Sequence, residues 1–191
     1  IVCFGEKNKF CDENSELFPI SQYAIEKVEV ERAIMSRSNS ISLRLATVFG
    51  MSPRMRTDLL VNDFVYKALN DRSLVLFEKQ FKRNFIHVRD VAEALIHAIE
   101  NFDLMNGEIY NVGLSSANIS KQELAEAIKK YIPELQIFYA EFAKDPDQRN
   151  YIVSNAKIEA TGFKTSFTLD DGIQELIKGY KMISNNKYTN I

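Results

Sequence analysis

Tyr23 and Lys27 are the residues of this chain whose types and spacing point most directly to acid–base chemistry. On a helix, residues four positions apart lie on one face, one turn from each other. An ammonium held beside a phenol favours the phenolate, which is the form that can accept a proton from a substrate hydroxyl. The alternative is a helix with one half-buried tyrosine and one solvated lysine, because this spacing is common by chance.

The composition indicates an ordinary globular chain, with 191 residues, 46% hydrophobic and 26% charged. A net charge of -2 gives no reason to expect nucleic acid or an anionic membrane as a partner. No run of eighteen or more apolar residues, as a membrane span would need, is present. Cys3 and Cys11 are too few for a disulfide framework, so we expect two free thiols and a reducing, cytoplasmic location.

Short apolar runs alternate with amphipathic segments along the chain, which predicts an α/β architecture. Ser120 and Glu123 form a predicted capping box, and Pro133 limits the helix that follows. The expected helices cover 21–35, 58–70, 89–100, 121–132 and 168–183, and the expected strands cover 41–49, 74–77, 84–88, 109–113 and 135–139.

The seven glycines contain no G-x-x-G-x-x-G or G-x-G-x-x-G arrangement that would cradle a dinucleotide phosphate. The chain also begins at Ile1, in residues that resemble the end of a strand. We therefore expect a fragment whose glycine-rich N-terminal half is absent.

Several stretches occur in the order seen in one enzyme family. They are Cys3-Phe4-Gly5-Glu6, the segment from Pro19 through Tyr23 and Lys27 to Glu31, Leu43 to Gly50 with the Ser52–Arg56 loop, Arg83 to Ala92, Glu108 to Gly113, and Asp145 to Arg149. Together they resemble the C-terminal portion of the extended short-chain dehydrogenase/reductases, in their NAD-dependent epimerase/dehydratase branch, which acts on nucleotide sugars.

This resemblance implies the C-terminal part of a Rossmann-like doubly wound sheet, together with a small α/β substrate-binding lobe. Residues 1–52 would complete the NAD-binding domain and carry the Tyr/Lys helix, and residues 53–191 would form mainly the substrate-binding lobe. Within the latter, about 73–113 would return to the Rossmann-like core. The expected cofactor is NAD or NADP. A homodimer through a four-helix bundle is expected in the full-length protein, with Val28, Ile34 and Met35 as candidate contacts.

In the family that these motifs resemble, Tyr23 corresponds to the catalytic acid/base and Lys27 to the residue that binds the nicotinamide ribose. Both therefore count as catalytic and as cofactor-binding. A catalytic Ser or Thr would immediately precede Ile1. Val2 occupies the position where dehydratases and decarboxylases carry a Glu, so we expect neither of those reactions.

On the substrate side, the resemblance assigns Arg83 and Arg149 to the nucleotide diphosphate, for which a guanidinium fork is well suited. A surface salt bridge is the alternative for each. Phe77 matches an aromatic residue near the base, with a core position as the alternative. Thr47 occupies the place of a substrate-binding Asn, and Leu60 belongs to a stretch that touches the nucleotide.

Other polar residues are less specific. Arg54 and Arg56 either face the sugar or are solvated, His87 is expected to be packed, and His97 to lie on a helix surface. These two histidines and two distant cysteines offer no metal-ligand spacing, so no metal is expected. The family's glycine-containing G-D-G-S-Q turn is replaced by Glu78–Lys82.

The function expected from these residues is that of a nucleotide-sugar epimerase fragment, which oxidises a sugar hydroxyl transiently with Tyr23 as acid/base. The alternatives are a nucleotide-sugar 4-keto reductase and an inactive homologue that binds NAD or a nucleotide. We expect the fragment alone to be inactive.

Overall fold

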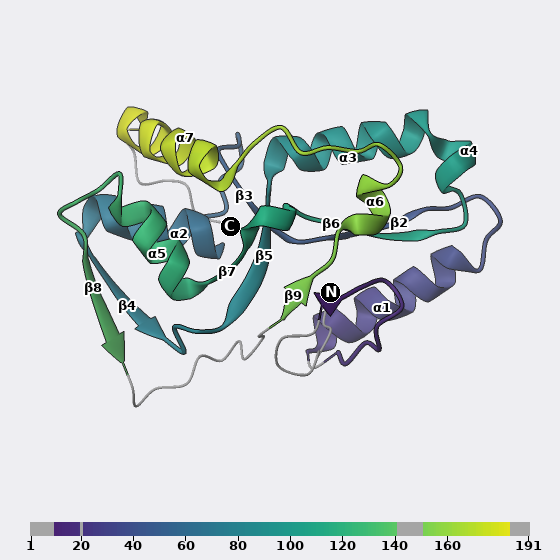
Figure 1. Ribbon diagram of the computed structural model, residues 1–191, viewed down its shortest axis with the longest axis horizontal. Helices are drawn as coiled ribbons and strands as arrows, with labels where there is room; N and C mark the ends of the chain where they lie inside the picture. Colours follow the sequence, from purple (N-terminus) through teal and green to yellow (C-terminus); the bar gives the residue numbers. More distant parts are fainter. Residues whose placement is uncertain (1–9, 20, 141–150, 184–191) are drawn as a thin grey trace.

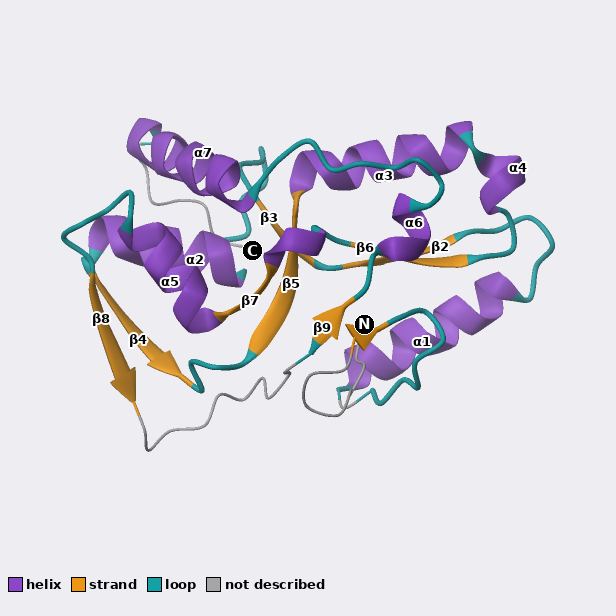
Figure 2. Ribbon diagram, viewed as in Figure 1, coloured by secondary structure: helices purple, strands orange, loops and turns teal. Residues whose placement is uncertain are grey.

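The structure is a computed structural model that describes residues 10–19, 21–140 and 151–183 (Figures 1 and 2). Its elements form two groups that meet at strand β5 (Lys82–His87). One group, on the right in Figure 1, is built on strands β2 (Ser42–Leu45) and β6 (Ile109–Val112), which pair in parallel. Helix α3 (Val88–Glu100) lies on one side of this pair and helix α1 (Gln22–Met35) on the other.

The second group, on the left in Figure 1, is built on strands β4 (Ser73–Phe77) and β8 (Gln136–Ala140), which are also parallel. Its helices are α2 (Leu60–Asn70), α5 (Lys121–Lys129) and α7 (Leu169–Met182). Their apolar faces meet in one continuous core, because each helix repeats buried residues at helical spacing. A smaller core lies beneath α3, around Ile86, Tyr110 and Val112.

The predicted strand 41–49 is two strands, so this prediction is wrong in one respect. β2 pairs with β6, whereas β3 (Thr47–Phe49) pairs in parallel with β5. The chain changes partner at Ala46, whose N–H still donates to the Val112 carbonyl at 2.8 Å. An apolar run predicts a buried strand but cannot reveal that its two halves join different neighbours.

The predicted helices and the remaining strands are confirmed to within a few residues, including the capping box at Ser120 and the caps at Ser21 and Thr168. The sequence missed the short elements, which are β1 (Phe10–Cys11), α4 (Phe102–Met105), η1 (Ser115–Ala117), β7 (Asn118–Ser120), β9 (Ile152–Val153) and α6 (Ala156–Glu159). β7 runs antiparallel to β5, and β1 runs parallel to β9. These pieces are too short to show a hydrophobic period.

Cys11 is disulfide-bonded, so the prediction that both thiols are free is wrong. No helix within the described ranges is long and apolar enough to cross a membrane. The predicted division into domains at residue 52 stays a prediction.

Candidate active site

Helix α1 presents Tyr23 and Lys27 on one face. Ser21 caps the helix, and its side-chain oxygen accepts a hydrogen bond from the Ala24 N–H at 3.2 Å. This cap places Tyr23 in the first turn, where 69% of its surface is exposed. The Lys27 ammonium lies 5.3 Å from the centroid of the Tyr23 ring. The shared face is therefore confirmed. Tyr23 is exposed and not half-buried, whereas Lys27 is exposed, as the alternative also expected.

The loop after β3 brings a second cation towards Tyr23. Arg56 makes two hydrogen bonds to Asp58, at 2.9 and 2.7 Å. The bond to Asp58 is the main reason that the pKa of Arg56 is raised, and the charge of Tyr23 contributes in the same direction. The reciprocal bond from Arg56 lowers the pKa of Asp58. Of the two arginines left open by the sequence, Arg56 is bound by Asp58 and is the one whose pKa the charge of Tyr23 helps to raise.

Asn62 holds this loop in place, and the sequence did not single it out. Its side chain is buried, accepts a hydrogen bond from the Gly50 N–H at 3.1 Å and donates to the Arg56 carbonyl at 2.9 Å. Gly50 has a φ of +116°, and a Cβ there would come within 2.6 Å of the His87 ring. The start of the loop therefore requires glycine, and Asn62 ties that start to Arg56.

Arg83 lies on β5 and is only 4% exposed. The alternative of a surface salt bridge is therefore wrong for this residue. Phe77 is the half-buried last residue of β4, and its carbonyl accepts a hydrogen bond from the Lys121 ammonium at 3.0 Å. Lys121 is itself buried at the start of α5, and its role was not foreseen from the sequence. Its position directly after the capping Ser120 gave no signal of this burial, which depends on the distant β4 strand.

The other predicted site residues lie as follows. Thr47 begins β3, is half-buried, and pairs with Phe85 of β5. Leu60 is the first residue of α2 and packs against the larger core. Arg149 and Val2 lie outside the described residues. The predicted site residues in the described part of the chain thus fall into two groups. One lies on α1, near the loop after β3, and the other lies along β4 and β5.

His87 is packed, as predicted, and belongs to a network that the sequence did not reveal. Its ring stacks on Phe167 with centroids 4.4 Å apart, and its Nε2 lies 2.6 Å from a Glu175 oxygen. The other Glu175 oxygen accepts a hydrogen bond from Arg89 at 2.6 Å. His97, expected on a helix surface, is half-buried and pairs with Thr161 at 2.8 Å.

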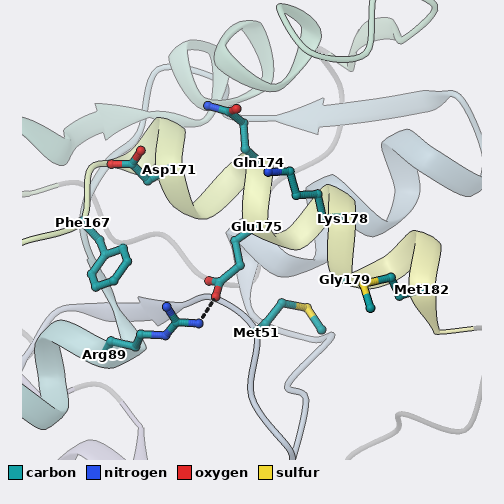
Figure 3. A pocket seen from close by; sticks show the side chains of 9 residues that line it. All are labelled: Met51, Arg89, Phe167, Asp171, Gln174, Glu175, Lys178, Gly179 and Met182. Carbon is teal, nitrogen blue, oxygen red and sulfur yellow. Dashed lines mark hydrogen bonds and ion pairs between the residues drawn. The ribbon is translucent and has the colours of Figure 1, made fainter.

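A cavity of about 450 Å³ opens above this network, between α7, the start of α3 and Met51 (Figure 3). Arg89 and Glu175 form an ion pair in its wall, and Lys178 and Asp171 add one further charge of each sign. None of the predicted site residues lines it. Its opposite charges compensate, whereas α1 presents a phenol beside one ammonium.

No group of three or more His, Cys, Asp or Glu side chains in the described part of the chain is arranged to hold a metal ion.

Solved structures show which fold this arrangement belongs to. The dTDP-glucose 4,6-dehydratase of Bacillus anthracis str. Ames, in complex with NAD, matches with a TM-score of 0.80 at 22% identity, over 95% of this chain and 58% of that one. The UDP-glucose 4-epimerase of Thermus thermophilus, also with NAD, matches with a TM-score of 0.76 at 23% identity, over 93% of this chain and 59% of that one. The predicted Rossmann-like α/β fold class is confirmed.

Sequence comparison points to the same family. A dTDP-4-dehydro-6-deoxyglucose reductase of Escherichia coli is 26% identical over 189 residues, which cover 93% of this chain and 58% of the relative. The chain thus spans less than two thirds of the length of these relatives. The family model described as "NAD dependent epimerase/dehydratase family" matches residues 3–113, and its NAD dependence agrees with the predicted cofactor class. More than half of the chain lies in this match, and the chain belongs to the NAD-dependent epimerase/dehydratase family.

Proposed function

We propose that this chain is the catalytic-helix and substrate-binding part of an NAD(P)-dependent nucleotide-sugar epimerase. The observation that carries the proposal is the pairing of an exposed Tyr23 phenol with the Lys27 ammonium on α1. Family membership supports it, because the family is NAD-dependent. The protein would act as a homodimer once the chain is joined to the part that completes the cofactor site.

Tyr23 would move the proton in this reaction. Its phenolate accepts the proton of the sugar hydroxyl as the carbinol carbon is oxidised, and the phenol returns that proton when the carbonyl is reduced from its other face. The bound nicotinamide supplies the hydride acceptor and donor. Net redox change is zero in the epimerase, and only the configuration at one carbon changes.

Lys27 and Arg56 would stabilise the phenolate form of Tyr23. The Lys27 ammonium lies 5.3 Å from the Tyr23 ring centroid, and Arg56 would add a second positive charge from the loop after β3. Lys27 would also donate to the nicotinamide ribose hydroxyls, as its place in the helix motif implies. Arg56 is held in place by Asp58 and Asn62.

Arg83 and Arg149 would bind the diphosphate of the nucleotide. For Arg83 the supporting observation is its burial, because a buried guanidinium interacts with phosphate oxygens more strongly than a solvated one. Phe77 would stack on the base, with Leu60 and Thr47 completing the walls of the substrate site. Residues 1–52 would form part of the NAD-binding domain and 53–191 mainly the substrate lobe.

A nucleotide-sugar 4-keto reductase is the second candidate. The E. coli relative that matches 93% of this chain carries the name of such a reductase. Tyr23 would then protonate the alkoxide formed from the keto sugar, with Lys27 beside it in the same role, and the reduced cofactor would be consumed. The third candidate, an inactive nucleotide-binding homologue, would need neither residue.

Turnover by the full-length protein distinguishes these candidates. Each of a set of UDP-, GDP-, CDP- and dTDP-sugars and their 4-keto forms is incubated with and without reduced cofactor. Interconversion of two sugars without net cofactor loss identifies an epimerase, and stoichiometric loss identifies a reductase. The absence of turnover with every sugar would favour the inactive homologue.

Tyr23→Phe tests the acid/base directly. Removing a positioned general acid/base should lower kcat by about 10²- to 10⁴-fold. The matched control is Tyr66→Phe, which removes a phenol hydroxyl from α2 while leaving its ring against Tyr180, and it should retain wild-type turnover. Unchanged kcat in Tyr23→Phe would show that Tyr23 is not the acid/base.

A further inference from the structure

Helix α1 rests on the sheet through a single narrow stripe of residues. Its four least exposed positions are Ala24, Val28, Glu31 and Met35, spaced four, three and four residues apart, so they lie on one side of the helix. Only Ala24 among them is fully buried. Three of the four are apolar and can slide past their neighbours. Glu31 is the charged member. Its hydrogen bonds depend on orientation, whereas the apolar contacts of the other three do not.

Glu31 forms a closed set of hydrogen bonds with strand β2. The Arg44 guanidinium donates to one Glu31 oxygen at 2.8 Å and to the other at 2.6 Å, and the Ser42 hydroxyl donates to the first at 2.8 Å. Arg44 also donates to the Glu13 carbonyl at 3.3 Å. The two side chains are only 9% and 14% exposed, so water competes little for these bonds.

This geometry restrains more than the separation of the helix from the sheet. A two-pronged guanidinium–carboxylate pair fixes direction as well as distance. Glu31 lies one turn beyond Lys27 and two turns beyond Tyr23 on the same helix, or about 6 and 12 Å along its axis. Rotation of α1 about its axis, or sliding along it, would break the pair and displace both catalytic side chains together.

We propose that Glu31 and Arg44 are positioning residues for Tyr23 and Lys27, and that they set the rotation and axial position of the catalytic helix on β2. This inference rests on the proposed function of Tyr23. Neither residue touches substrate. They act by fixing where the Tyr23 phenol and the Lys27 ammonium lie along the helix axis, so that both reach the sugar hydroxyl and the cofactor.

The test uses Glu31→Gln and Arg44→Met in the full-length protein, with kcat, KM and fraction folded measured for each. A displacement of about 1 Å can cost on the order of 100-fold in rate. We therefore expect kcat per folded molecule to fall about 10- to 100-fold, with KM for the nucleotide sugar little changed. The double variant should be no slower than the worse single variant, because the two residues act as a unit.

Two further variants separate geometry from charge and from stability. Arg44→Lys keeps the charge but loses the fork, so kcat should fall between the wild-type and Arg44→Met values. Arg72→Met removes an exposed ion pair with Glu134 and should leave kcat unchanged. If Arg44→Met does not fold, kcat per folded molecule of the nearly isosteric Glu31→Gln variant tests the proposal by itself.

Wild-type kcat per folded molecule in Glu31→Gln would overturn the inference, even with a lower melting temperature. A pH–rate profile gives an independent readout: a displaced Lys27 no longer favours the Tyr23 phenolate, so the acidic limb of kcat, on which the phenolate is protonated, should move to higher pH. An unmoved limb contradicts the positioning role. If Tyr23→Phe abolishes turnover but Glu31→Gln does not alter it, only the positioning fails; if Tyr23→Phe has no effect, the proposed function itself fails.

Discussion

Helices α1 and α7 have the same length, 14 residues each, but are attached to the molecule in opposite ways. α7 buries Gly172, Ile173, Leu176 and Ile177 and begins with a capping box at Thr168. α1 buries only Ala24 and begins with a single cap bond. One helix is part of a core, and the other is held against the β2/β6 pair by a stripe of residues and an ion pair.

The helix that is less deeply buried is the one that carries the proposed catalytic residues. α7 packs into the larger core with Phe49 and Phe64 and carries none of the proposed catalytic residues. α1 carries Tyr23 and Lys27 and leaves Ile25, Val30 and Ile34 exposed. A helix attached so narrowly can be positioned by a few polar bonds, and its exposed apolar residues remain available to other contacts. Of the three residues that we expected to contact a second copy, Ile34 is exposed, whereas Val28 and Met35 belong to the stripe that faces β2.

The largest expected difference between the two helices is in stability. Leu176→Ala removes a fully buried side chain from the core of α7 and should lower the free energy of unfolding by about 2–5 kcal/mol. Val30→Ala shortens a side chain of α1 that is 49% exposed and should change it by about 0.5 kcal/mol or less. Urea denaturation of the full-length protein measures both. Equal effects would contradict the view that α7 is core and α1 is not.

How far the sequence could predict these differences depends on the kind of contact involved. The i, i+4 spacing placed Tyr23 and Lys27 together, and apolar periodicity placed α7 in a core, because both are local patterns. The pairing of Glu31 with Arg44 joins residues thirteen positions apart, and that of Glu175 with His87 joins residues eighty-eight apart. Spacing alone carries no signal for such contacts. The burial of Arg83 was likewise unpredictable, because it depends on how β5 is covered by later elements.

A smaller effect on stability is expected when the glycines of α7 are replaced, and these variants test how tightly this helix is packed. A Cβ at Gly172 would clash with the Phe49 ring, so Gly172→Ala should destabilise the protein by about 1–3 kcal/mol. A Cβ at Gly179 on the same helix would clash with Sδ, Cε and Cγ of Met51, an unbranched side chain that can rotate away. Gly179→Ala should be neutral or stabilising by up to about 1 kcal/mol, since alanine favours helix over glycine.

Melting curves of the two glycine variants compare one helix with itself, so intrinsic helix propensity cancels. A loss of stability in both would mean that α7 tolerates no added volume anywhere. If neither variant loses stability, Phe49 can move away from the added methyl group, and the packing of α7 is as adaptable as that of α1.

The smallest expected effect is the response of α1 to acid. Burial raises the pKa of Glu31, but hydrogen bonds from Arg44 and Ser42, together with the Arg44 charge, outweigh burial and lower it below its ordinary value of 4.5. A carboxyl whose folded pKa is depressed stabilises the fold above its unfolded pKa, and this contribution disappears as the pH falls through the folded pKa. The Glu31 contribution should therefore be complete at neutral pH and be lost only below about pH 4.5.

Amide hydrogen exchange, resolved by helix and corrected for the intrinsic effect of pH, measures this response. On acidification below pH 4.5 the amides of α1 should lose protection before those of α7, because α1 depends on a titrating side chain and α7 on buried apolar ones. In Glu31→Gln the protection of α1 should already be low at neutral pH and should change little with acid. Simultaneous loss of protection in both wild-type helices would show that global unfolding precedes release of α1, and that the Glu31–Arg44 pair is not its weakest attachment.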